Sequence, residues 1–485
     1  MNKTLGLSAI SIAIAGIIGL SGCGGGGGGG DSSSTGSSSV TTSGVITGFG
    51  SVFVDGVEFE TSNSSFSLDD GEDAPEIEDS LEVGMVVTVT GTVNPDGVTG
   101  TATHIEYDDE LEGIIISSNI DADGTGTMDV MGQNVIVDAT TIFESDDPGI
   151  TGMEQLAAGN VVEVSGYSSG AGDIFATRVE LERTTHTSGE VIEVKGLVSM
   201  LTATTFEIGS LVVDYSGAVL EVPGSMLADQ LYVEVKSTDG FDPATGHLLA
   251  SEVELEEDGD MDFDGSAGED TEIKGIVTAV NSASEFEIGG KRIIITSATD
   301  FEHGGSGDIV IGGQVEAEGS LDDSGALLAR KIEFEEHSNI EMEGILEAVS
   351  GSGADGSVTV FGQTITITTE TIMIDERDLA PEHFFSLDDL VATQDYLEID
   401  LHRDPASGEL IADKLERDDD DDGKAELEGP VEDITAPDQL VIAGVSVDIS
   451  STSAPAFGIG TALELKGAYD PGTGIFTANS VELDD

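Results

Sequence analysis

The sequence predicts an all-β protein, a tandem array of about six small five-stranded antiparallel barrels, and three observations lead to this prediction. The first is composition: 65 of the 485 residues are glycine, hydrophobic residues make up 38% of the chain and aromatic residues 5%. This hydrophobic content is too high for a disordered acidic tail, and Val- and Ile-rich runs between glycines favour strands and turns. The second is a sequence unit that recurs along the chain, and the third is the same order of apolar segments within each copy.

The N-terminal segment is typical of a lipoprotein signal peptide. Lys3 precedes an apolar run over residues 5–20, and Leu20-Ser21-Gly22-Cys23 follows, which resembles the bacterial lipobox. Residues 1–22 are therefore predicted to be removed and Cys23 to be acylated. Because Cys23 is the only cysteine, no disulfide can form within the chain. The alternative is an ordinary secretory signal with a chance cysteine.

A tether follows the predicted lipidation site. Residues 24–30 are all glycine, and a Ser/Thr-rich run continues to Ser43. Such a composition is flexible and would hold a folded body away from a membrane. Gly24, directly after the cysteine, favours sorting to the outer membrane by resemblance to enterobacterial lipoproteins. We therefore expect a bacterial cell-envelope protein, either periplasmic or surface-exposed.

Two short signatures mark six copies of one unit. Each copy ends in an alanine, a branched aliphatic residue three positions later and then a glutamate, at Ala102–Glu106, Ala176–Glu180, Ala250–Glu254, Ala329–Glu333, Ala412–Glu416 and Ala478–Glu482. Five copies open with Glu-x-x-Gly, at Glu110–Gly113, Glu193–Gly196, Glu272–Gly275, Glu341–Gly344 and Glu426–Gly429, and the first opens with the degenerate Val45–Gly48. Self-similarity of this kind indicates a repeat architecture.

Five strands are expected in each unit. After the opening glycine come a first strand, a second that ends in a glycine turn, and a third such as Thr364–Thr368, in which Ile365 and Ile367 would face the core. A variable segment resembling a short helix follows, as in 151–156 and 380–390, and then two more strands. Alanine and isoleucine three apart cannot share a strand face, so a bulge is expected between them, as between Ala329 and Ile332. This order is that of an OB-like barrel.

The signatures define the predicted segments, and the runner-up architecture is a six-bladed propeller. Because the linkers are of unequal length, independent barrels like beads on a string are favoured over a closed ring. The predicted segments are a signal peptide at 1–22, the lipidated cysteine and tether at 23–43, barrels at 44–109, 110–189, 190–257, 272–337, 338–417 and 426–485, and acidic linkers at 258–271 and 418–425.

Charge decides which partners are plausible. The chain has 96 Asp and Glu against 16 Lys and Arg, a formal charge of −80. Polyanions will not approach such a surface, so nucleic acid is excluded as a partner, and divalent cations are favoured. The expected partners are the membrane, through the lipid anchor, and another envelope protein or matrix component. The oligomeric state is left open.

Two acidic segments between units are candidate calcium sites. Asp258, Asp260, Asp262 and Asp264 alternate before Gly265, and from Asp260 this matches the start of an EF-hand-like loop. The pattern recurs at Asp418, Asp420 and Asp422 before Gly423. Neither loop has glutamate at its twelfth position. The alternative is a solvated acidic linker.

Catalysis finds little support, and we expect no enzyme. The seven histidines fall at unrelated positions of the repeat. Only the fifth unit is distinct, through an insertion over residues 375–394 that contains Phe384 and Phe385. This aromatic pair is expected to plug its own barrel, and the alternative is a contact point for a partner.

The repeats resemble a known bacterial family. The lipobox, the tether and the segments Gly48–Gly56, Gly84–Gly91 and Gly159–Gly166 are similar to the family catalogued as domain of unknown function 5666. The resemblance covers essentially the whole mature chain, best in the first two units and loosest in the fifth. It implies the architecture and a surface location, and no catalytic residues. The predicted role is therefore structural, adhesive or scaffolding, with calcium-stiffened joints; the alternative is buffering of divalent cations in the envelope.

Overall fold

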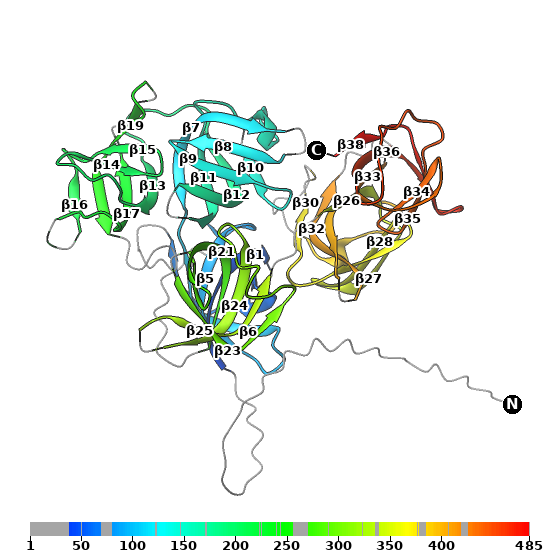
Figure 1. Cartoon of the computed structure of the whole chain (residues 1–485), viewed down its shortest axis with the longest axis horizontal. Helices are drawn as coiled ribbons and strands as arrows, with labels where there is room; N and C mark the ends of the chain where they lie inside the picture. Colours follow the sequence, from blue (N-terminus) through cyan, green and yellow to red (C-terminus); the bar gives the residue numbers. More distant parts are fainter. Residues whose placement is uncertain are drawn as a thin grey trace, which may run out of the picture.

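The protein is all-β, as the sequence predicts, and its strands lie in three groups of barrels (Figure 1). The computed structural model describes residues 38–485 except 50, 69–79, 122–123, 146, 170–171, 223, 225, 239, 243, 256–269, 290, 323, 335–338, 376, 378–384, 406, 419–424 and 485.

The first two barrels follow the predicted strand order, with the third strand in two pieces. Barrel 1 consists of β1 (Ser38–Gly48), β2 (Val52–Val54), β3 (Val57–Glu60), β4 (Ser65–Leu68), β5 (Val86–Val93) and β6 (Thr99–Tyr107). Barrel 2 consists of β7 (Leu111–Ile120), β8 (Gly126–Val130), β9 (Gln133–Val137), β10 (Ile142–Ser145), the 3-10 turn η2 (Met153–Gln155), β11 (Val161–Ser168) and β12 (Asp173–Arg183).

Barrels 3 and 4 differ in how far their strands are broken up. Barrel 3 consists of β13 (Ile192–Leu197), β14 (Thr205–Ile208), β15 (Leu211–Asp214), β16 (Val219–Glu221), β17 (Tyr232–Ser237), β18 (Phe241–Asp242), β19 (His247–Leu249) and β20 (Glu252–Leu255). Barrel 4 consists of five unbroken strands, β21 (Asp270–Ser282), β22 (Glu285–Ile288), β23 (Lys291–Glu302), β24 (Gln314–Leu321) and β25 (Leu327–Phe334).

The last two barrels complete the chain. Barrel 5 consists of β26 (Ile340–Ile345), β27 (Ala348–Ser352), β28 (Asp355–Val360), β29 (Gln363–Ile367), β30 (Ile372–Asp375), the 3-10 turn η4 (Leu387–Asp389), β31 (Tyr396–Arg403) and β32 (Leu410–Asp418). Barrel 6 consists of β33 (Ala425–Ala436), β34 (Gln439–Ile442), β35 (Val445–Asp448), β36 (Ala462–Asp470), β37 (Ile475–Ala478) and β38 (Glu482–Leu483).

Barrel 4 shows the strand order most simply. β21 pairs antiparallel with β22 and β24, β22 pairs antiparallel with β23, and β24 pairs antiparallel with β25. β25 closes the circle by pairing in parallel with β23. A parallel contact between the third and fifth strands of an otherwise antiparallel barrel is the OB-like arrangement, which confirms the predicted fold class.

Glycine turns connect the second strand to the third, as predicted. Met131 and Gly132 have φ angles of 48° and 85°, and Phe361 and Gly362 have φ angles of 50° and 71°. Two successive positive φ angles are those of a type I′ turn, whose twist matches that of a β-hairpin. Met131 and Phe361 adopt a conformation that side chains rarely take, and both are buried.

The predicted bulge between alanine and isoleucine is confirmed. The register of β24 against β25 shifts between Glu318 and Gly319, which leaves one extra residue, Arg330, on β25. Ala329 and Ile332 therefore both point into the core, with 3% and 0% of their surface exposed. The fifth strands of barrels 1, 2 and 5 shift at the equivalent place.

The predicted short helices are single 3-10 turns. In barrel 5, η4 packs on the β27–β28 hairpin, where the Leu387 N–H donates to the Gly353 carbonyl over 2.9 Å. Phe385 is 7% exposed and belongs to the core of its barrel, as expected for a plug, whereas Phe384 lies outside the described residues.

The barrels join in pairs through their opening strands. β1 of barrel 1 pairs in parallel with β21 of barrel 4, β7 of barrel 2 pairs antiparallel with β13 of barrel 3, and β26 of barrel 5 pairs antiparallel with β33 of barrel 6. We call these contacts joint 1:4, joint 2:3 and joint 5:6. Each opening strand thus pairs along one edge within its own barrel, and a short stretch of its other edge pairs with a second barrel.

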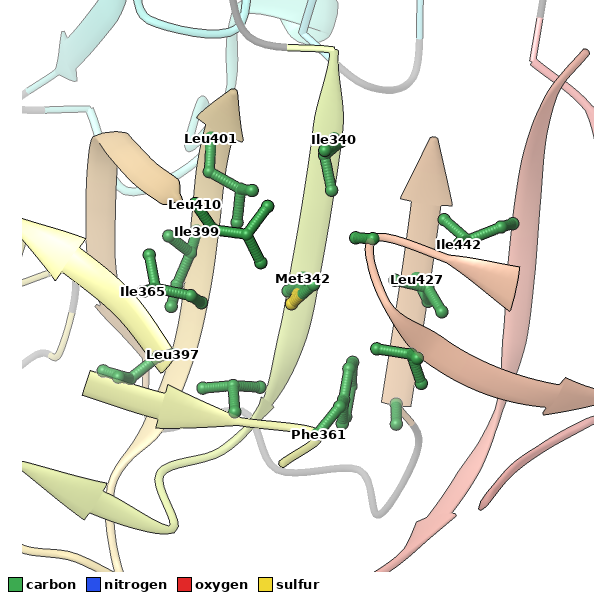
Figure 2. Close-up of a cluster of buried hydrophobic side chains, with 14 of the residues drawn as sticks. Ile340, Met342, Phe361, Ile365, Leu397, Ile399, Leu401, Leu410, Leu427 and Ile442 are labelled. Carbon is green, nitrogen blue, oxygen red and sulfur yellow. The ribbon is translucent and has the colours of Figure 1, made fainter. Parts of the chain in front are cut away.

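The cores follow the joints only in part. One continuous cluster of buried side chains fills barrels 5 and 6, and another fills barrels 2 and 3, whereas barrels 1 and 4 have separate cores. Figure 2 shows how β26 carries Met342 between Ile399 on one side and Leu427 on the other. Barrels 5 and 6 therefore share one hydrophobic core, and so do barrels 2 and 3.

The three pairs meet at a central junction. Val83 of barrel 1, Ile142 of barrel 2, and Ile372 and Ile374 of barrel 5 form one buried cluster, and Phe49 packs against it. This contact corrects the expectation of independent beads on a string. Unequal linkers do not decide the matter, because barrels that are distant in sequence bury surface against each other.

Candidate functional sites: acidic segments and barrel joints

Most of the predicted site residues lie outside the described part of the chain. This holds for Cys23, for the aspartates at 258, 260, 262 and 264, and for those at 420 and 422. Asp418 is the last residue of β32, where its backbone pairs with Tyr396, and its side chain is not described. The structure thus brings none of these side chains together, and the two calcium sites and the lipidation site stay predictions.

Two further features are absent from the described residues. Within them, no group of three or more His, Cys, Asp or Glu side chains is arranged to hold a metal ion. No helix among them is long and apolar enough to cross a membrane.

A continuous acidic face crosses joint 5:6. Glu341 of β26 lies directly opposite Asp400 of β31 on one side and Glu428 of β33 on the other. Two residues on, Glu343 lies between Glu398 and Glu426 in the same way. Side chains directly opposite on neighbouring strands are about 5 Å apart, so these carboxylates form two rows across both barrels.

The carboxyl groups in these rows are poorly solvated. Burial, together with the neighbouring carboxylates of Glu398, Asp400 and Glu428, raises the pKa of Glu341 to about 10. Burial likewise raises the pKa values of Glu398 and Glu428 to about 8. These groups favour a bound proton at neutral pH.

Joint 2:3 has the same geometry but carries cations. Glu112 of β7 lies opposite Glu163 of β11 and Glu193 of β13. Here the Arg183 guanidinium forms an ion pair with Glu112, and Lys236 Nζ lies 3.8 Å from Glu193 Oε2. The repeat thus places carboxylates at both joints, and the cations Arg183 and Lys236 at joint 2:3 come from positions outside the opening signature.

Joint 1:4 contains a third acidic group. The Thr42 hydroxyl of β1 donates to Asp55 Oδ2 over 2.8 Å. Glu272 of β21 is hydrogen-bonded to Glu316 of β24, and burial raises the pKa of both, that of Glu316 to about 8. Two carboxyl groups that share a hydrogen bond must also share a proton.

Buried cations hold neighbouring barrels together. Arg178 of barrel 2 is 3% exposed, and its guanidinium binds Glu82 and the Val83 carbonyl of barrel 1 as well as Glu144 and Glu180 of its own barrel. Burial disfavours the charged guanidinium, but these carboxylates outweigh that effect and raise its pKa.

Buried lysines hold other pairs of barrels together in the same way. Lys195 of barrel 3 donates to the Asp109 carbonyl of barrel 2 over 2.6 Å, and Lys414 of barrel 5 donates to the Ala139 carbonyl of barrel 2 over 3.0 Å. In an acidic chain with few cations, these buried cations bind a backbone carbonyl of another barrel.

Sequence reasoning identified the opening signature but missed its role. Glu-x-x-Gly was interpreted as a marker of where a unit begins, although its glutamates lie at the joints. The signal was available: charged residues alternate with apolar ones on a strand whose glycine leaves no room for a side chain. A Cβ on Gly113 would lie 2.7 Å from Met131 Cε, and one on Gly344 would lie 2.6 Å from Phe361 Cε1.

Comparison with known proteins identifies the repeated unit. The family model described as Domain of unknown function (DUF5666) matches residues 41–106, 112–180, 274–333 and 343–416, more than half of the chain. These segments fall in barrels 1, 2, 4 and 5. The expectation that the fifth unit departs most from the family is therefore wrong, because the family model matches the fifth unit and does not match the third or the sixth. No curated protein matches the chain.

Proposed function

Because this chain belongs to the family described as Domain of unknown function (DUF5666) and repeats the unit of that family, we propose that it is a lipid-anchored structural protein of the bacterial cell envelope. It serves as a scaffold or adhesive body held off the outer membrane by its tether. The role is binding and architectural and not catalytic. The partner is another envelope protein or a matrix component, and not nucleic acid.

The observation that carries this proposal is the pairing of all six opening strands within the chain. Part of one edge of each of these strands pairs with another barrel. Exposed strand edges invite uncontrolled pairing with other chains, and barrels joined in this way present a closed, rigid body. With a formal charge of −80, that body repels anions and attracts cationic surfaces and metal ions.

Calcium is the proposed stiffening ion, and the topology supports this assignment. The first acidic segment leads into β21, the strand of barrel 4 in joint 1:4, and the second leads into β33, the strand of barrel 6 in joint 5:6. Ca²⁺ bound by Asp258, Asp260, Asp262 and Asp264, or by Asp418, Asp420 and Asp422, would therefore order the chain as it enters a joint.

Calorimetric titration of residues 31–485 with Ca²⁺ tests this assignment. We expect a few saturable sites with dissociation constants of about 10⁻⁴ to 10⁻³ M, the range of extracellular modules. Changing Asp260, Asp262 and Asp264 together to asparagine should abolish the site at the first segment. The matched control changes Glu221, Glu252 and Glu254 of barrel 3 to glutamine, which removes the same charge from outward-facing strand positions and should leave Ca²⁺ uptake intact.

The same titration separates the second candidate function, buffering of divalent cations, which the charge of −80 favours. Buffering predicts many weak sites that disappear as salt is raised. If both triple variants take up Ca²⁺ like the wild type and salt abolishes the uptake, the acidic segments are charged linkers and the stiffening role is wrong.

The lipid anchor has a separate test. In the host bacterium, Cys23→Ser should move the protein from the membrane fraction to the soluble fraction almost completely, because acylation needs the thiol. Incorporation of an alkyne-labelled fatty acid should disappear as well, and Ser37→Ala in the tether serves as the unchanged control. A variant that stays in the membrane and keeps its label would overturn the assignment.

A further inference from the structure

The strand pairing across joint 5:6 is short and brings like charges together at both of its ends. β26 and β33 pair over three positions, Glu341 with Glu428, Met342 with Leu427 and Glu343 with Glu426. Carboxylates directly opposite each other destabilise a sheet when both are ionised. The pairing therefore depends on how these charges are neutralised.

Among the described residues, the cations nearest this face lie on the strands outside its central three, and one of them, Lys414, lies opposite Asp400. Lys466 of β36 is 3.0 Å from Glu426 and 2.9 Å from Glu464, and Lys414 of β32 is 3.0 Å from Glu416. In the part of the chain that the structure describes, no ion pair reaches Glu341, Glu343 or Glu428.

Other acidic groups complete the surroundings of Glu341. The groups that face it are Asp400 and Glu398 of β31, and Glu428 and Glu426 of β33, with Glu343 on its own strand. Behind these, Asp484 faces Glu428, and Asp138 of barrel 2 faces Asp400. Protons are thus the countercharge that the geometry leaves for the centre of the joint.

Joint 2:3 serves as an internal comparison. Its row of three opposed carboxylates, centred on Glu112, corresponds in the repeat to the row centred on Glu343 at joint 5:6. Unlike Glu343, Glu112 forms an ion pair within the described residues, with Arg183. The two joints share a core arrangement and differ in what neutralises the central carboxylate.

We propose that joint 5:6 is a proton-dependent contact, in which the pairing of β26 with β33 is held while Glu341 is protonated and loosens when it ionises. Joint 2:3 is held by its ion pairs and lacks this dependence. A change of pH would then alter the geometry of barrel 6 relative to barrel 5 and leave barrels 2 and 3 unchanged.

The direction of the effect follows from linkage. The pKa of Glu341 is raised to about 10 in the closed joint, above its value in the open chain. The stabilisation is therefore complete below the ordinary pKa of a glutamate, about 4.3, and declines as pH rises toward the folded value. Deprotonation of Glu398 and Glu428, with pKa values of about 8, contributes in the same window.

Hydrogen exchange of the full chain, read by mass spectrometry and corrected for intrinsic exchange rates, tests the proposal. Between pH 6 and pH 9.5, amides of residues 340–345 and 425–430 should lose protection by about tenfold or more, the effect of one unit of differential pKa. Amides of residues 111–116 and 192–197 at joint 2:3 should change by less than about threefold. Equal losses at both joints would mean general charge repulsion and would overturn the proposal.

Two matched variants identify the group. Glu341→Gln should retain protection at joint 5:6 at pH 9.5. Glu112→Gln should lower protection at joint 2:3 equally at both pH values, because Arg183 loses one of its three carboxylate partners. If Glu341→Gln perturbs folding, Glu428→Gln tests the same contact from the opposite strand. If both glutamine variants at joint 5:6 lose protection as the wild type does, ionisation at this contact is not the cause.

Discussion

Replacing Arg178 with methionine should lower the free energy of unfolding of barrels 1 and 2 by about 3 kcal/mol, the lower end of the range for breaking a buried ion pair. Methionine fills much of the same volume, but it leaves Glu82, Glu144 and Glu180 without their shared cation. The lower end applies because these carboxylates are about a third exposed, so water partly screens them. The Val83 carbonyl also loses its donor.

The measurement is urea unfolding, monitored by hydrogen exchange of the amides of β5 and β12. A probe of individual strands is needed because a chain of several barrels need not unfold in one step. Arg330→Met is the matched control. Arg330 lies on the outer face of barrel 4 with its side chain 51% exposed, 3.2 Å from Glu318. Exposed pairs contribute at most about 1 kcal/mol, so this variant should be nearly neutral. Equal effects of the two variants would show that Arg178 does not hold barrels 1 and 2 together.

Replacing Phe361 with alanine should destabilise barrels 5 and 6 together, by about 3–5 kcal/mol. Phe361 belongs to the β28–β29 turn of barrel 5, yet its ring centroid lies 5.3 Å from that of Tyr469 and 5.4 Å from that of Phe476, both in barrel 6. The substitution leaves a cavity between the two barrels. Alanine must adopt the same positive φ as Phe361, so the substitution does not relieve any backbone strain.

Differential scanning calorimetry combined with hydrogen exchange of β36 and β37 would detect this coupling. Phe286→Ala in barrel 4 makes the same change at a residue that is 1% exposed in a core confined to one barrel. It should lower the stability of barrel 4 and leave other barrels protected. If Phe361→Ala affects barrel 5 alone, the shared core of barrels 5 and 6 does not couple their unfolding.

Local features of the fold were predictable from sequence because they depend on neighbouring residues. The three-residue spacing of Ala329 and Ile332 required a bulge, since a regular strand would turn one of them to solvent. The glycine turns followed from the positive φ that they need, although the sequence did not indicate that Met131 and Phe361 share it. The short helices were overestimated, because segments such as 151–156 hold only one turn between two strands.

The candidate sites were predictable to a lesser degree. Alternating aspartates at 258–264 point to hard cations by their spacing alone, and this argument needs no structure. The acidic rows at the joints could not be found in this way. Glu341 and Glu428 are far apart in sequence, and each looks like an ordinary solvent-facing residue of an alternating strand.

The sequence by itself determined the all-β class, the repeated unit, the strand order of each barrel and the acidic character of the surface, because periodicity, turn residues and net charge are local or additive properties. The tertiary structure decided which barrels join. Five of the six opening signatures share Glu-x-x-Gly, so the signatures do not indicate which strands pair, and β1, whose signature is degenerate, pairs with β21, roughly 230 residues away. Shape and the placement of a buried cation such as Lys195 at joint 2:3 distinguish these edges, and both exist only once the chain is folded.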